Sequence, residues 1–272
     1  MLLQKVLLPV AVLALAGFAH GGEIKLAGDF VQGGLVVGEI APGSTVEFDG
    51  RDIRVSETGV FIIGFGRDEG SELVLAARFP NGTREERAIK VAPREYKIER
   101  VDGVPPRTVN PDPEDFDRIR AESALIRQAR SIDDARTDFL PGFTWPAKGR
   151  ISGVYGSQRV LNGEPRRPHY GVDVAAPTGS PVYAPADGLV TLSYEDMFYS
   201  GGTLILDHGH GLSSTFLHMS KLVVEEGVYV KRGDKIGEIG ATGRATGPHL
   251  DWRMNLLGRR LDPQLLVGDM PE

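Results

Sequence analysis

Short runs in which apolar and polar residues alternate recur in two stretches of the chain, and such runs predict β-strands. In the first stretch, from Glu23 to about Lys97, seven runs are separated by turn-forming segments such as APGS and PNGT. Roughly seven strands within ~100 residues favour an immunoglobulin-like sandwich. The second stretch, from residue 143 to about 267, alternates again and has glycine at its corners. The predicted fold class is therefore all-β.

A connector of different character separates the two stretches. The proline-rich segment VDGVPPRTVNPDP is expected to be extended, and Pro113 with the acidic residues around it is a good helix start. The apolar residues of the following DFDRIRAESALIRQAR form one narrow stripe, so we expect a helix that packs lightly. The predicted organisation is a sandwich over 20–97, a linker with a helix over 98–142, and a second β domain over 143–272.

The first nineteen residues read as a secretory signal peptide. One cation, Lys5, precedes an apolar stretch that ends near Phe18, and Ala19 is a suitable small residue before a cleavage point. The apolar stretch is shorter than the ~20 residues that span a bilayer. We therefore expect an exported protein, periplasmic rather than anchored, with no stable membrane insertion after signal cleavage.

Charge and cysteine content exclude some classes of protein. The formal net charge is −6, so the chain lacks the basic footprint of a nucleic-acid-binding protein, and we expect no nucleic-acid partner. The sequence contains no cysteine, which excludes a disulfide framework.

Five polar residues in the second β stretch are candidates for a metal site. His169 and Asp173 are four residues apart, His218 lies in an alternating run, and His249 and Asp251 flank one leucine. Residues two apart on a strand share a face. Three histidines and two carboxylates could supply three ligands to a divalent metal and two bases beside it, as in hydrolytic zinc sites.

Each of these elements alone is a weak signal, but their order and glycine framing are specific. The segments GSQRVLNGEPRRPHYGVDVAAPTGSPVYAPADGLV, LDHGHGLSSTFLHMSKL and GDKIGEIGATGRATGPHLDW together resemble the lysostaphin/LytM-type zinc metallopeptidase family. The resemblance covers about residues 143–267, and the N-terminal sandwich looks like the accessory domain found before some of these peptidases. It implies a mostly antiparallel β fold with a groove, and hydrolysis of stem or cross-link peptides in bacterial peptidoglycan.

The resemblance also implies roles for individual residues. His169 and Asp173 match the first two metal ligands of the family, and His218 and His249 match its two catalytic histidines. Asp251 stands where the family usually has its third ligand, a histidine. A carboxylate can bind zinc at nearly the same distance as imidazole, so we expect one Zn²⁺ and note that a harder divalent ion would also suit this set.

Other polar residues near these motifs are open to simpler interpretations. Arg159 and Arg167 are candidates for substrate binding, although a solvated loop is an equal alternative for Arg167. His208 and His210 could form a second metal pair, but a hairpin turn is the simpler explanation of DHGHG. Trp252 is expected to be a core residue.

Two other functions compete with the peptidase. An inactive scaffold that binds peptidoglycan or activates another wall hydrolase would explain Asp251 as decay of the site. A biotinyl- or lipoyl-carrier barrel would explain the turn pattern of VYAPADGLV, but it needs a lysine at an exposed hairpin tip, and DHGHG has none.

Overall fold

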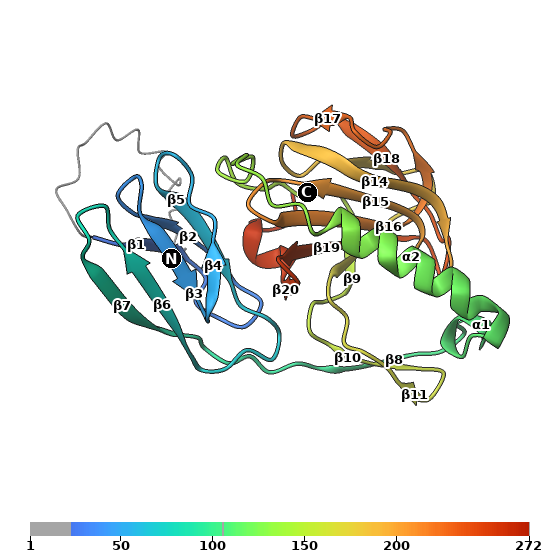
Figure 1. Ribbon diagram of the computed structural model, residues 1–272. Coiled ribbons are helices and arrows are strands. Elements are labelled where there is room, and N and C mark those ends of the chain that lie inside the picture. Colours follow the sequence, from blue (N-terminus) through green and yellow to red (C-terminus); the bar gives the residue numbers. More distant parts are fainter. Residues whose placement is uncertain (1–22, 105, 272) are drawn as a thin grey trace, which may run out of the picture.

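The computed structural model describes residues 23–104 and 106–271, so the expected signal peptide lies outside the described residues. Figure 1 shows two β-rich parts joined by an extended strand and a helix. Within the described residues, no helix has the length and apolar character needed to cross a membrane. The mostly β fold predicted from the alternating runs is confirmed.

The N-terminal part is a sandwich of two antiparallel sheets. One sheet has the order β1-β2-β5 and the other the order β4-β3-β6-β7. Phe48, Phe61 and Phe65 fill the core between them and are fully buried. The strands are β1 (Lys25–Gly28), β2 (Leu35–Glu39), β3 (Thr45–Phe48), β4 (Arg51–Ile53), β5 (Val60–Gly64), β6 (Glu72–Arg78) and β7 (Arg84–Lys90).

The C-terminal part is built on one large antiparallel sheet with the central order β17-β14-β15-β16-β19-β12-β9. Its middle strands are buried along almost their whole length, as expected for apolar runs covered on both faces. The strands are β9 (Arg150–Gly153), β12 (Val172–Ala175), β13 (Pro181–Tyr183), β14 (Gly188–Met197), β15 (Gly201–Asp207), β16 (Leu212–Leu222), β17 (Tyr229–Val230), β18 (Lys235–Ile239), β19 (His249–Leu256) and β20 (Arg259–Leu261), followed by the 3₁₀-helix η2 (Pro263–Leu266).

The connector contains a strand that local alternation did not predict. β8 (Ile98–Val101) pairs in parallel with β10 (Gln158–Leu161), which also pairs with β11 (Glu164–Pro165). The short helix α1 (Pro106–Val109) follows β8. The linker therefore contributes a strand, β8, to the small sheet that β8, β10 and β11 form beside the C-terminal sheet.

The helix predicted at Pro113 is present and packs against the C-terminal sheet. A 3₁₀ turn, η1 (Pro113–Asp115), leads into α2 (Phe116–Ala129). Ala129 belongs to a small apolar cluster with residues of β14 and β15, and Ile126 packs against that cluster. Phe116, at the other end of α2, remains 49% exposed, while Glu122 in the middle of the helix is buried and accepts a hydrogen bond from Phe198 N.

The sandwich is attached to the C-terminal sheet near β20. Leu35 and Ile62 of the sandwich belong to the same buried cluster as Leu256 and Leu261. Arg94 also donates to Asp262 over 2.8 Å. These contacts fix the sandwich over the end of β19 that lies away from His249.

Candidate metal centre

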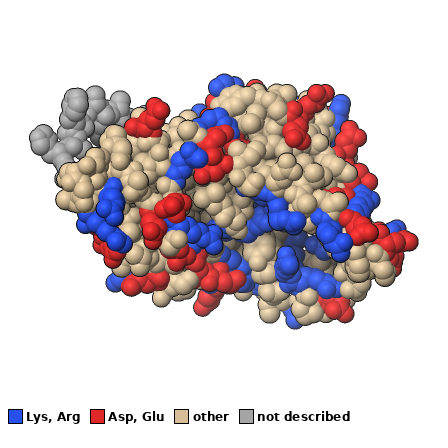
Figure 2. Space-filling model, viewed as in Figure 1, with Lys and Arg blue, Asp and Glu red and all other residues tan. Residues whose placement is uncertain are grey.

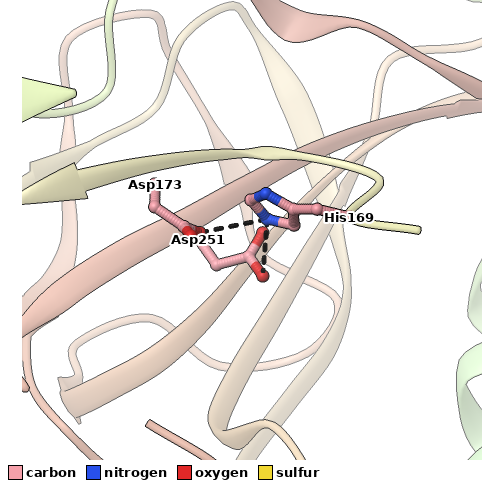
Figure 3. A group of neighbouring side chains, drawn as sticks. All are labelled: His169, Asp173 and Asp251. Atoms are coloured by element: carbon pink, nitrogen blue, oxygen red, sulfur yellow. Dashed lines mark ion pairs between the residues drawn. The ribbon is translucent and has the colours of Figure 1, made fainter. Parts of the chain in front are cut away.

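Two neighbouring strands and one preceding loop position the candidate metal ligands. Asp173 of β12 lies directly opposite Asp251 of β19 in the antiparallel register. His169 lies in the segment that leads into β12, and its ring reaches back toward both carboxylates. Figure 3 shows the three side chains converging on one point.

The three side chains are buried and close together. One ligand atom from each lies within 4.8 Å of the others. His169 Nε2 is 3.1 Å from Asp173 Oδ1 and 3.4 Å from Asp251 Oδ2. Neither His169 Nε2 nor Asp173 Oδ1 has a hydrogen-bond partner among the described residues, because the atoms are near but not aligned. Buried polar atoms that face a common point without bonding one another fit a cation between them.

The charges around this point are strongly coupled. Burial favours the neutral form of His169, but the carboxylates of Asp173 and Asp251 outweigh it and raise the pKa of the ring. Burial also opposes ionisation of Asp251, and the nearby Arg253 overcomes this and holds the pKa of that carboxyl well below its usual range. Both carboxylates are therefore charged at neutral pH, as metal ligands must be.

Each carboxylate ligand is also held by an arginine. Arg253 Nε lies 2.9 Å from Asp251 Oδ1, and its Nη2 lies 2.5 Å from Oδ2. Arg159 Nη2 lies 2.9 Å from Asp173 Oδ2. The sequence interpretation assigned no role to Arg253, although its place two residues after Asp251 puts it on the same face of β19.

Two further histidines stand beside the ligands with their rings fixed. The Nδ1 atoms of His218 and His249 lie 2.8 Å from the carbonyl oxygens of Thr242 and Gly247, respectively. A carbonyl only accepts, so each Nδ1 carries a proton, and in the neutral tautomer the lone pair is on Nε2. The ring centroids are 4.8 Å apart, and His249 Nε2 is 3.9 Å from Asp173 Oδ1.

The backbone of His218 is unusual for a strand residue. Its φ is 65°, in the left-handed region, where β15 and β16 lose regular register between Gly202 and Leu204. Such a conformation costs free energy and is found where a side chain must be re-aimed. Burial lowers the pKa of His218 to about 4, so the ring is neutral and able to accept a proton at neutral pH.

Two glycines make room for the carboxylates. A Cβ atom at Gly171 would overlap Asp251 Oδ1, and one at Gly153 would overlap Asp173 Oδ2. The carboxylates of Asp251 and Asp173 thus occupy the space that side chains at these two positions would need.

One of the candidate ligands, Asp173, faces a cavity of about 410 Å³. Asp173, His218 and His249 line it, together with residues of β8 and β10. Arg159 lines this cavity too, whereas Arg167 is exposed and lines a neighbouring one. A peptide in the cavity would therefore contact the linker strand β8 as well as the C-terminal sheet.

The structure also shows the surroundings of His208 and Trp252. His208 cannot offer a free ring nitrogen to a metal, because Nδ1 and Nε2 lie 2.6 Å from Asp187 O and 2.8 Å from Ser214 Oγ. His208 to Gly211 form the turn between β15 and β16, as expected for DHGHG. Trp252 is fully buried against Trp145, which confirms its predicted place in the core.

Comparison with known proteins identifies the C-terminal region. The profile of Peptidase family M23 matches residues 167–263, which include all five candidate site residues. The chain is 40% identical over 149 residues to the peptidoglycan DD-endopeptidase ShyA of Vibrio cholerae, covering 53% of this chain and 34% of that protein. It is 36% identical over 123 residues to the DD-carboxypeptidase/endopeptidase Mpg of Neisseria meningitidis, covering 45% of this chain and 28% of that protein. The chain thus spans about a third of the length of these relatives.

A solved structure resembles nearly the whole chain. It is described as an M23 peptidase from Pseudomonas aeruginosa and is 30% identical, with a TM-score of 0.66. The match covers 87% of this chain and 94% of that one, so the sandwich and the connector are included. The chain belongs to peptidase family M23.

Proposed function

We propose that this protein is an exported zinc metalloendopeptidase that hydrolyses peptide bonds in the stem or cross-link peptides of peptidoglycan. The observation that carries the proposal is the convergence of His169, Asp173 and Asp251 beside two oriented histidines, where Asp173 and both histidines line one cavity. The named activity of ShyA supports peptidoglycan as the substrate, and the name of Mpg supports a peptidase activity. A substrate in the cell wall requires export, and a periplasmic setting agrees with the signal peptide expected at residues 1–19.

The donor set suits one divalent cation. A cation bound there would supply Lewis-acid polarisation of the scissile carbonyl and of an attacking water. Two carboxylates and one neutral imidazole would offset the charge of Zn²⁺ completely, whereas the family's usual set leaves one positive charge. The oxygen-rich set should also accept harder ions such as Mn²⁺ more readily than the usual set does.

The two histidines are assigned to proton transfer. Each has a proton on Nδ1, held by a carbonyl, and in its neutral form each ring has a lone pair on Nε2. One Nε2 can take a proton from the attacking water, and the same ring can then return that proton to the leaving amine. The other ring, when Nε2 carries a proton as well, can donate to the developing oxyanion. Because the rings are fixed before substrate arrives, little reorganisation is needed during the reaction.

The pairing of Asp251 with Arg253 favours one alternative, a scaffold without activity that binds peptidoglycan or activates another hydrolase. An arginine that neutralises the third ligand would weaken the attraction for a cation. In that case the purified protein should contain no stoichiometric metal. The enzyme proposal instead expects about one zinc or manganese per chain by elemental analysis.

Digestion of purified peptidoglycan tests the proposal directly. The wild-type protein should release peptide fragments that mass spectrometry identifies as products of one bond type. His249→Ala should retain metal but release fragments far more slowly, and His169→Ala should lose both metal and activity. If metal-loaded wild-type protein released no fragments from peptidoglycan, the enzyme proposal would be contradicted and the scaffold alternative would remain.

A further inference from the structure

A second and larger cavity, of about 820 Å³, lies next to the catalytic one. It is enclosed by the last turns of α2 on one side and by β16, β19 and β20 on the other. Arg159, His218 and Arg244 line both cavities. A ligand held at the candidate metal centre could therefore extend past His218 into the larger space.

Arginine dominates the lining of this second cavity, which we call the arginine cavity. Two of its arginines, Arg159 and Arg253, are those that hold the ligand carboxylates. None of the described lining residues is an aspartate or glutamate. Figure 2 shows Lys and Arg side chains gathered around a hollow below α2. Its other arginines are Arg127, Arg130, Arg167, Arg244 and Arg260.

Four of the seven arginines in this cavity carry charge that no ion pair within the described residues balances. Arg127, Arg130, Arg167 and Arg260 form no ion pair within the described part of the chain. Arg130 Nη2 donates to Thr215 Oγ1 over 2.7 Å, but its buried Nε and the buried Nη1 of Arg260 have no hydrogen-bond partner among the residues that the structure describes. Buried donors of this kind are costly unless a ligand satisfies them.

Burial and neighbouring positive charge both lower the pKa of two guanidinium groups in this cavity. Burial, followed by the charge of Arg253, lowers the pKa of Arg260 to about 10. Burial, followed by Arg260 and Arg253, lowers the pKa of Arg130 well below its usual range. A bound anion would relieve both the repulsion and the desolvation.

We propose that the arginine cavity binds the carboxylate groups of an acidic peptide substrate while the neighbouring bond lies at the metal centre. Guanidinium groups bind carboxylates through two parallel hydrogen bonds, and several arginines in one cavity suit a peptide with more than one carboxylate. Ile126, Leu217 and Leu257 add apolar surface that a free inorganic anion would not use. This inference rests on the proposed peptidase function, because it assigns that peptidase its substrate class.

The chain as a whole does not attract anions, since its formal net charge is −6. The arginine cavity is therefore a local exception. A local positive field inside a concave, poorly solvated site raises affinity for the matching anion far more than the same charges would on an open surface.

The test compares two forms of one substrate. A soluble cross-linked muropeptide with free carboxylates and the same molecule with those carboxylates amidated are hydrolysed by the full-length, metal-loaded protein. The ratio of the two kcat/KM values should favour the free-carboxylate form by about tenfold or more, the size expected for one charge-assisted hydrogen bond. Equal kcat/KM values for the two forms would overturn the proposal.

Variants show whether the preference comes from this cavity. Arg127→Gln and Arg260→Gln should each reduce the ratio by about five- to tenfold, mainly through KM for the free-carboxylate form. Arg120→Gln is a matched control on the same helix, because Arg120 pairs with Asp117 on the surface and does not line the cavity. Thermal melting of each variant monitors folding. A ratio unchanged in both cavity variants would overturn the proposal.

A binding measurement separates this inference from the peptidase proposal. Calorimetry with His249→Ala and each muropeptide should show tighter binding of the free-carboxylate form. If wild type cleaves neither form but this preference is found, the peptidase proposal fails and the arginine cavity stands. If inorganic phosphate displaces the free-carboxylate muropeptide at equal concentration, the cavity binds any small anion and the assignment to a peptide is wrong.

Discussion

Arg253 holds both carboxylate oxygens of Asp251, with Nε 2.9 Å from Oδ1 and Nη2 2.5 Å from Oδ2, while Oδ2 also lies 3.4 Å from His169 Nε2. The carboxylate of Asp251, the proposed third ligand, is therefore oriented and charged. In the proposed site, Asp251 and Arg253 together would take the place of a neutral imidazole.

This pair makes metal affinity depend on Arg253. Arg253→Gln should weaken zinc binding by ~10–100-fold, the usual effect of losing a group that orients a ligand. Arg253→Lys keeps the charge but cannot form the bidentate hydrogen bonds. Its zinc affinity should therefore lie between those of wild type and Arg253→Gln. Competition with a chelating dye measures both. Tighter binding in Arg253→Gln would show that Arg253 competes with the metal, as the scaffold alternative requires.

The effect of replacing Asp251 by the family's usual histidine also depends on the ion pair between Asp251 and Arg253. Asp251→His alone leaves the guanidinium of Arg253 without its partner in a largely buried place, and such a loss typically costs ~3–5 kcal/mol. The double variant Asp251→His/Arg253→Met should recover much of that stability and bind zinc more tightly than wild type. Chemical denaturation and zinc titration check the two effects. If Asp251→His is as stable as wild type, the ion pair contributes less than its geometry indicates.

Much of the site could be predicted from the sequence, and the missing parts have a common physical cause. The structure brings together His169, Asp173, His218, His249 and Asp251, which the sequence proposes as site residues because their spacing is specific and glycines frame it. Arg253 was missed because an arginine in an alternating strand usually faces water, and only its pairing with Asp251 reveals otherwise.

In the fold too, local features could be predicted from the sequence and long-range contacts could not. Strands were predictable from local alternation, whereas the partner of a strand is decided by contacts far along the chain. β8 pairs with β10 across about sixty residues of sequence, so its place in the wall of the catalytic cavity could not be read from REYKIERV alone. The arginine cavity is equally non-local, since its charges come from α2, β10, β19 and β20.

Removal of either oriented histidine should separate metal binding from turnover. His218→Ala and His249→Ala should each retain metal and reduce kcat by ~10²–10⁴, the usual contribution of a general acid or base. His169→Ala and Asp251→Ala should lose metal and activity together. Elemental analysis alongside peptidoglycan digestion distinguishes the two groups. Full zinc occupancy with normal activity in Asp251→Ala would show that Asp251 is not a ligand.

The pH dependence of stability should reveal the buried His208. Burial lowers its pKa to about 4 from an ordinary value of 6.5, so the unfolded chain binds the proton more readily between these values. Its contribution to the free energy of unfolding is complete above pH 6.5 and is lost as pH falls toward 4, by about 3 kcal/mol. Chemical denaturation across that range should show a shallower pH dependence for His208→Gln than for wild type. Parallel curves would mean that His208 does not titrate differently in the folded state.

The last prediction concerns where the C-terminal domain begins. We expect residues 143–272 to fold alone, but Phe139 is buried in the same core cluster as Phe216 and Trp252. Arg136 also donates to Asp207 and to the carbonyl oxygen of Asp207. A fragment that begins at residue 130 should therefore be more stable than one that begins at 143, by roughly the ~3–5 kcal/mol that a buried phenylalanine contributes. Phe139→Ala in the longer fragment is the control and should remove most of that difference. Equal unfolding midpoints for the two fragments would place the domain boundary at 143, as the sequence predicts.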